Sequence, residues 1–286
     1  MFHGSLVALV TPMHEDGAID YASFEKLIDW QIENKTDGLV ILGTTGESPT
    51  IEHDERRELI KCAVARCRQK IPVIVGCGTN STAHTISLTQ EAMSLGADAV
   101  LLVTPYYNKP TQEGLFQHYR AIATAVSIPQ ILYNVPGRTC CDLLPETISR
   151  LSQFANIVGV KEATGDVNRL KKLLSLNLQM NYFTGCDENN MEFMLAGGKG
   201  TISVAANIAP KQIHELTVAA LKGDRALSEK IDHSLRELYR MIFLETNPIP
   251  TKWALQQMGL IQGGIRLPLT PFNAAYHSQL QSVLQA

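Results

Sequence analysis

Short, continuous apolar segments alternate with longer segments of helical spacing along most of the chain. The apolar segments are rich in β-branched residues and are typical of strands buried on both faces, as in a parallel sheet. The segments between them carry apolar stripes at helical spacing, such as Leu59, Ile60, Ala63, Val64 and Cys67. The predicted strands span residues 5–10, 38–42, 72–76, 99–103, 130–133, 157–160, 181–185 and 201–204.

Eight strands that are each followed by a helix-length segment predict eight βα units. In a chain of 286 residues, such units favour a closed (β/α)8 TIM barrel, an α/β fold, over an open doubly wound sheet. A dinucleotide-binding sheet would carry G-x-G-x-x-G after its first strand, and the sequence there, TPMHEDG, lacks this motif.

The strand pattern stops after residue 223. A helical stripe then continues with Leu227, Ile231, Leu235, Leu238 and Ile242. We therefore predict two domains, a (β/α)8 barrel over residues 1–223 and a C-terminal helical domain over residues 224–286.

Composition and charge argue against several classes of function. A net charge of −3 favours neither nucleic acid nor an anionic membrane as a partner. No apolar segment approaches the roughly 18 residues of a membrane-spanning helix, and the N-terminus lacks the basic region and cleavage site of a secretory signal. The 6 cysteines match neither a zinc spacing nor a disulfide scaffold, so we expect a cytoplasmic protein without a metal.

One strand end carries the most distinctive candidate for catalysis. Lys161 directly follows the apolar segment 157–160, and the active sites of barrels lie at the C-terminal ends of strands. Burial disfavours an ammonium ion, so the Lys161 pKa should be lowered. A neutral lysine amine can attack a carbonyl carbon and form a Schiff base, which requires no metal or other cofactor. Tyr133, at the end of the preceding strand, would lie beside the lysine and move protons.

Two features of this strand end stay open. Side chains alternate along a strand, so Gly159 and Lys161 share one face, and if that face points into the barrel, Gly159 leaves space beside the lysine stem. The alternative to catalysis is an ion pair between Lys161 and Glu162 or another carboxylate.

Motifs at several strand ends resemble a known family. They are GTTGE (43–47), TPYYNKP (104–110), YNVPGRT (133–139), VGVKEAT (158–164), GCDENNMEFMLAGGKGTISVAAN (185–207), NPIPTKWAL (247–255) and GIRLPLTP (264–271). Together they resemble the dihydrodipicolinate synthase and N-acetylneuraminate lyase family of class I aldolases over nearly the whole chain. The resemblance implies a barrel with a C-terminal helical domain, usually assembled as a homotetramer from tight dimers.

The resemblance also implies catalytic roles. Lys161 matches the residue that forms an imine with pyruvate, and Tyr133 matches the proton donor and acceptor. Thr44 and Tyr107 match its relay partners, and the tyrosine at the Tyr107 position reaches across from a neighbouring subunit in the family. Without such roles, Thr44 would satisfy turn backbone groups and Tyr107 would serve packing.

The implied substrate-binding residues are Thr45, Ile202, Gly185 and Arg138. Thr45 matches a contact to the pyruvate carboxylate, Ile202 a backbone contact beside it, and Gly185 ends the seventh strand. Arg138 distinguishes the subfamilies by their second substrate, because a guanidinium can hold a substrate carboxylate through two hydrogen bonds. Members of the lysine pathway resemble this chain in having arginine here, whereas sialic-acid lyases generally do not. The implied reaction is the condensation of pyruvate with L-aspartate 4-semialdehyde in diaminopimelate and lysine biosynthesis.

Three alternatives remain at this stage. Arg138 could pair with Asp142 or Glu146 on the surface. The chain could be another pyruvate-dependent aldolase of the same family that cleaves a 2-keto-3-deoxy sugar acid. It could also be a non-catalytic barrel that binds a small ligand.

Many members of the family are inhibited by lysine at a dimer interface. The positions that this implies here are Ser48, His53, Asn80, Tyr106, Arg56 and His84. Arg56 and His84 depart from the pattern, because lysine-sensitive members carry histidine and glutamate there. Loss of a carboxylate for the effector's ammonium and gain of a positive charge should weaken binding. We therefore expect weak or absent inhibition by lysine.

Overall fold

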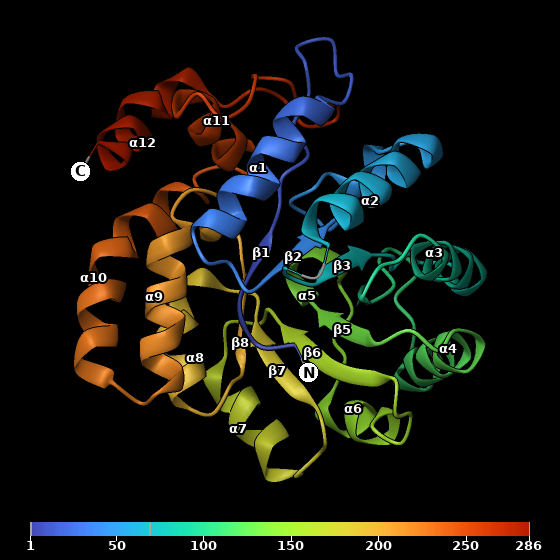
Figure 1. The fold of residues 1–286 in the computed structure, drawn as a ribbon. Coiled ribbons are helices and arrows are strands. Elements are labelled where there is room, and N and C mark those ends of the chain that lie inside the picture. Colours follow the sequence, from blue (N-terminus) through green and yellow to red (C-terminus); the bar gives the residue numbers. More distant parts are fainter. Residues whose placement is uncertain (1, 69, 286) are drawn as a thin grey trace.

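The computed structural model describes residues 2–68 and 70–285, and in these residues eight parallel strands close into a barrel that helices surround (Figure 1). The barrel closes where β1 pairs with β8, with Leu6 opposite Ile202. The predicted (β/α)8 barrel is confirmed, and no strand end differs from its expected place by more than two residues. The strands are β1 (Gly4–Ala8), β2 (Gly38–Ile41), β3 (Val73–Gly76), β4 (Ala99–Val103), β5 (Gln130–Asn134), β6 (Ile157–Glu162), β7 (Asn181–Thr184) and β8 (Gly200–Ser203).

One helix covers each strand on the outside of the barrel. Side chains that accept hydrogen bonds from free backbone amides begin several of these helices, for example Asp20, Ser81, Thr111 and Asp166. The barrel helices are α1 (Tyr21–Glu33), α2 (His53–Cys67), α3 (Thr82–Ser94), α4 (Gln112–Ala125), α6 (Pro145–Leu151), α7 (Val167–Ser175), α8 (Asn190–Leu195) and α9 (Pro210–Leu221). Short helical turns follow four strand ends: η1 (Ser48–Thr50), α5 (Pro136–Thr139), η2 (Asp187–Asn189) and η3 (Ala205–Asn207).

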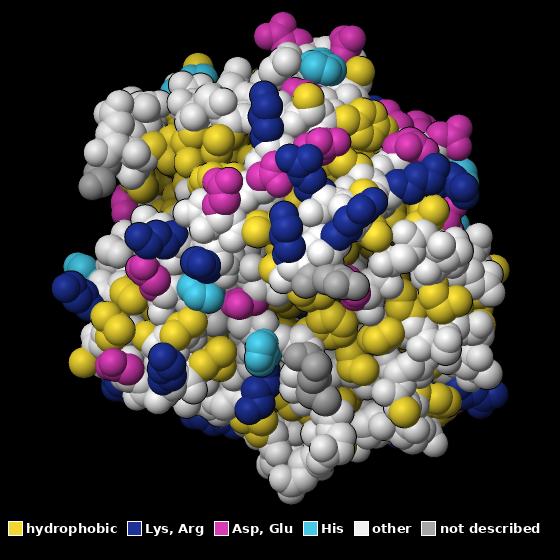
Figure 2. All heavy atoms as spheres, viewed as in Figure 1, with side chains coloured by type: hydrophobic (Ala, Val, Ile, Leu, Met, Phe, Trp, Pro, Cys, Tyr) yellow, Lys and Arg dark blue, Asp and Glu magenta, His cyan; other side chains and the backbone are white. Residues whose placement is uncertain are grey.

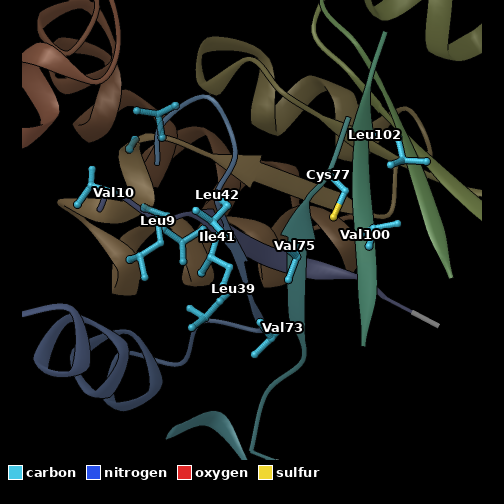
Figure 3. Packing of buried hydrophobic residues seen from close by; sticks show 14 of the residues in the cluster. Leu9, Val10, Leu39, Ile41, Leu42, Val73, Val75, Cys77, Val100 and Leu102 are labelled. Carbon is cyan, nitrogen blue, oxygen red and sulfur yellow. The ribbon is translucent and has the colours of Figure 1, made fainter. Parts of the chain in front are cut away.

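Alternate strand residues build two separate apolar clusters. Leu39, Ile41, Val73, Val75 and Leu102 face outward and pack with the helices (Figure 3). The strand residues that alternate with these point inward. Together with side chains of the other strands, they form a smaller cluster inside the barrel: Leu6, Val40, Ile74, Leu101, Ile131, Tyr133, Phe183 and Ile202. Both faces of the strands are therefore buried, which is why their sequences read as continuous apolar segments.

Only helices follow β8 in the described part of the chain. They are η3, α9, α10 (Arg225–Met241), α11 (Ile249–Gln257), η4 (Ala274–Tyr276) and α12 (His277–Leu284), and the last ones lie to one side of the barrel (Figure 1). Leu235, Leu238 and Ile242 of the predicted stripe are buried, but Leu227 is exposed near the start of α10. The division into domains at residue 223 stays a prediction.

The surface over α1 and α2 carries both signs of charge. Cationic and anionic side chains lie side by side on the face that Figure 2 shows, and Arg66 of α2 forms ion pairs with Glu25 and Asp29 of α1. Within the described residues, no helix is both long and apolar enough to cross a membrane.

Candidate active site

A cavity of about 310 Å³ lies at the C-terminal ends of the strands. Its wall comes from residues that end or follow several different strands, which is the usual construction of a barrel active site. The cavity brings together six of the predicted site residues: Thr44, Thr45, Tyr133, Arg138, Lys161 and Gly185.

Lys161 points into the barrel from within β6. It lies opposite Tyr133 of β5 and Phe183 of β7 in the strand register, and residues at matching positions in neighbouring parallel strands point to the same face. The Lys161 side chain is buried, and its Nζ lies 4.4 Å from the centroid of the Tyr133 ring. Burial lowers the pKa of the Lys161 amine to about 8, although the nearby Asp187 carboxylate opposes this decrease. At such a pKa about a tenth of the amine is neutral at pH 7.

Glu162 does not pair with Lys161, so the alternative of an ion pair between these two residues is wrong. As the next residue along β6, Glu162 points outward, where Arg169 of α7 donates from Nε to its Oε2 at 2.6 Å. Asn134 also donates to this carboxylate, at 3.2 Å. Among the described residues, no carboxylate forms an ion pair with Lys161. The cavity therefore holds this amine without a carboxylate that pairs with it directly.

The glycine that makes room for the lysine stem is Gly185 and not Gly159. A Cβ atom on Gly185 would lie 2.7 Å from Cε of Lys161, which is too close for two carbon atoms that are not bonded to each other. A Cβ atom on Gly159 would instead lie 2.7 Å from the carbonyl oxygen of Asn181 in the neighbouring strand. Gly159 thus permits close strand packing, and Gly185 permits the lysine side chain to extend into the cavity.

Tyr133 is held protonated beside the lysine. Burial raises the pKa of its phenol to about 12, while Arg138 and an interaction with the Thr44 hydroxyl oppose part of this increase. A protonated phenol can donate a proton at neutral pH and accept one back from a neighbour. The arrangement of Lys161, Tyr133 and Thr44 therefore suits proton transfer to and from a substrate that is bound to the lysine nitrogen.

Two predicted residues lie outside this cavity. The Tyr107 side chain is 91% exposed, on the loop after β4, so the single chain does not bring it to Lys161. The Ile202 side chain is part of the inner apolar cluster of the barrel. Only its backbone could take the role that was expected of it.

Arg138 does not pair with either of the carboxylates expected for a surface role. Asp142 pairs with Arg169 at 2.9 Å, and Glu146 pairs with Lys172 at 2.6 Å. Arg138 lies on the cavity wall, and its Nη2 donates to the backbone oxygen of Asn247 at 3.3 Å. Its guanidinium is therefore available to a ligand carboxylate.

Asp187 and Asn247 are among the cavity residues that were not identified from the sequence, although their motifs were. Asp187 is buried after β7 and accepts hydrogen bonds from the Ser203 hydroxyl, the backbone amides of Val204 and Ala205, and the Asn190 amide. Asn247 precedes α11, and its Nδ2 donates to Oγ1 of Thr45 at 3.0 Å. A search of strand ends could have found Asp187, but Asn247 comes from a helical region far along the chain.

A second cavity of about 560 Å³ adjoins the first, and both have Thr44, Tyr133, Arg138 and Asn247 in their walls. It brings together all the residues expected at an effector site: Ser48, His53, Arg56, Asn80, His84 and Tyr106. Arg56 is buried, and its Nη2 donates to the backbone oxygen of Gly76 at 2.7 Å.

Comparisons with known proteins identify the family of this chain. The model of the dihydrodipicolinate synthetase family matches residues 1–286. A Coxiella burnetii protein named 4-hydroxy-tetrahydrodipicolinate synthase is 58% identical over 285 residues, which cover 100% of this chain and 98% of that protein. The crystal structure of a chloride-inhibited dihydrodipicolinate synthase from Acinetobacter baumannii, complexed with pyruvate, matches with a TM-score of 0.98 at 51% identity, covering 100% of this chain and 98% of that one. A monomeric dihydrodipicolinate synthase variant matches with a TM-score of 0.97 at 45% identity, covering 99% of this chain and 96% of that one. This chain belongs to the dihydrodipicolinate synthetase family.

Proposed function

We propose that this chain acts as a 4-hydroxy-tetrahydrodipicolinate synthase, the activity for which its relatives are named. It would be a lyase that condenses pyruvate with L-aspartate 4-semialdehyde through a Schiff base. The observation that carries the proposal is the buried amine of Lys161, which has a pKa of about 8 and lies beside the Tyr133 phenol in the cavity.

The first half of the reaction forms a nucleophile from pyruvate. The neutral Lys161 amine adds to the ketone carbon, and loss of water yields an imine whose protonated form withdraws electrons from the methyl carbon. Loss of a proton from that carbon gives an enamine. Tyr133 exchanges the protons with Thr44 and with the partner subunit's Tyr107. Thr45 and the backbone near Ile202 and Gly185 hold the pyruvate carboxylate.

The second half joins the two substrates. The enamine carbon attacks the aldehyde of aspartate semialdehyde, whose carboxylate binds the Arg138 guanidinium. The amino group of that substrate then attacks the imine carbon and displaces Lys161. Ring closure occurs in this transimination, and the lysine amine is regenerated for the next pyruvate.

Reductive trapping tests this assignment. The protein is incubated with pyruvate and borohydride, and intact-mass spectrometry followed by peptide mapping locates the added mass. We expect one pyruvate-derived increment, on the peptide that carries Lys161. Coupled assays with aspartate semialdehyde and with 2-keto-3-deoxy sugar acids then identify the second substrate, and activity with the sugar acids alone would contradict the proposal.

Replacement of Arg138 by alanine should chiefly weaken use of the aldehyde. Loss of a charge-assisted bidentate contact is expected to raise the KM for aspartate semialdehyde by about tenfold or more. The KM for pyruvate should change much less, because Arg138 is not assigned to it. Steady-state kinetics with each substrate varied in turn measure this difference. An unchanged aldehyde KM and rate would exclude the proposed carboxylate contact.

Inhibition by lysine should be weak or absent. The second cavity contains Arg56, His53 and His84, and among its described lining residues the only carboxylate is Glu47, which is already paired with buried Lys252. The ammonium of a bound lysine would therefore lack a free anionic partner. Initial rates are measured over a lysine titration, and half-inhibition at submillimolar lysine would overturn the expectation. His84→Glu, which supplies a carboxylate, should increase the sensitivity.

The chain would act on small molecules in the cytoplasm as a homotetramer built from two dimers. The strongly exposed Tyr107 supports assembly, because its proposed role needs a neighbouring subunit. Sedimentation of the protein at assay concentration measures the oligomeric state.

A further inference from the structure

The segment that joins α10 to α11 contributes a residue to the wall of the candidate active site. Asn247 in this segment lies far from the barrel strands in sequence, but its side chain is buried in the wall of the candidate active site. Nδ2 of Asn247 donates to the Thr45 hydroxyl oxygen at 3.0 Å. The amide plane is thereby fixed with respect to the GTTGE loop.

The other end of this amide, Oδ1, lacks a hydrogen-bond partner in the described part of the chain. Oδ1 of Asn247 is buried and accepts no hydrogen bond from any described residue. Leaving a buried acceptor unpaired is costly, so each such atom calls for an explanation. Because the residue lines a cavity, the missing donor is expected to arrive with a ligand.

Pyruvate cannot supply this donor, because it carries only a carboxylate, a ketone and a methyl group. An unpaired amide oxygen would repel the pyruvate carboxylate and not bind it. The donor must therefore come from the second substrate or from water. In aspartate semialdehyde the carboxylate and the ammonium are attached to the same carbon atom, so the ammonium lies close to whatever binds the carboxylate.

Asn247 lies beside Arg138, which is the residue proposed to bind the carboxylate next to that ammonium. Nη2 of Arg138 donates to the backbone oxygen of Asn247 at 3.3 Å, so the guanidinium and the amide are adjacent on the cavity wall. We propose that Asn247 determines specificity for an amino-acid aldehyde by accepting a hydrogen bond, through Oδ1, from the substrate ammonium. This inference rests on the proposed function, and it adds a residue of the C-terminal helical region to the substrate site.

The experiment compares two aldehydes that differ in the amino group. Aspartate semialdehyde carries it, and succinic semialdehyde has the same carboxylate and aldehyde without it. For Asn247→Ala, we expect the KM for aspartate semialdehyde to rise by about tenfold or more. The inhibition constant of succinic semialdehyde against aspartate semialdehyde should change less than about twofold, because that molecule never makes the contact.

A second variant separates contact from positioning. Asn247→Asp keeps an acceptor oxygen, so it should restore most of the selectivity between the two aldehydes. Equal weakening of both aldehydes in Asn247→Ala would mean that Asn247 only positions Thr45 and Arg138, and would overturn the proposal. An unchanged KM for aspartate semialdehyde would assign water as the donor and overturn it as well. Borohydride trapping of pyruvate on the same variants serves as the reference, since its failure in the unmodified protein would instead contradict the proposed function.

Discussion

Replacing Lys161 with alanine is expected to abolish both the condensation reaction and the trapping of pyruvate by borohydride. The variant lacks the only group proposed to bond the keto acid, so the imine and the enamine cannot form. The rate should fall by at least about 10³-fold, as is usual when a nucleophile is removed. Steady-state assays and intact-mass spectrometry after trapping measure the two losses. Undiminished labelling of the variant would disprove the assignment.

The pH dependence of trapping gives the same prediction a second readout. Addition to pyruvate requires the neutral amine, and the pKa of Lys161 is lowered to about 8. The initial trapping rate should therefore increase as the pH rises through about 8 and then level off, whereas an ordinary lysine would still be gaining reactivity near pH 10. Lys172→Ala is the matched control, because this lysine is exposed and paired with Glu146 on the surface. It should label like the unmodified protein.

Breaking the buried ion pair between Lys252 and Glu47 should have the largest effect on stability. Lys252 of α11 and Glu47 of the GTTGE loop are both buried, and Nζ of Lys252 donates to Oε1 of Glu47. Lys252→Met removes the ammonium and leaves a buried carboxylate whose other contact is the backbone amide of Arg266. We expect a loss of about 3–5 kcal/mol in the free energy of unfolding, which corresponds to a decrease of the apparent Tm on the order of 10 °C.

Two controls test the cause of that loss. The double variant Glu47→Gln with Lys252→Met removes both charges, so it should be clearly more stable than Lys252→Met alone. Lys61→Ala breaks an exposed pair with Glu58 and should leave the melting temperature nearly unchanged. Thermal unfolding at one fixed protein concentration measures all three variants. A double variant as unstable as Lys252→Met would show that packing, and not the unpaired charge, explains the loss.

The strand ends were the most predictable part of the candidate site. Lys161, Tyr133 and Arg138 each end or closely follow an apolar segment, and parallel strands bring their C-terminal ends to one edge. Their places in the cavity could therefore be expected before their geometry was known. Asn247 could not be found in the same way, because no local pattern relates it to Thr45 about 200 residues earlier. Its place depends on how the segment between α10 and α11 packs against the cavity wall.

The sequence by itself determined the class of fold and the identity of the chemical groups. Continuous apolar segments bury both strand faces, and this local requirement specifies eight βα units without knowledge of their packing. Only the tertiary structure decided the direction of each side chain. The alternation of β6 allows Lys161 to point inward or outward, and the closure of the barrel places it beside Tyr133 while Glu162 pairs with Arg169 outside. The same closure selects Gly185, and not Gly159, as the residue that leaves space for the lysine. Such contacts join residues from different strands. The order of amino acids along the chain does not by itself give the distances between these residues.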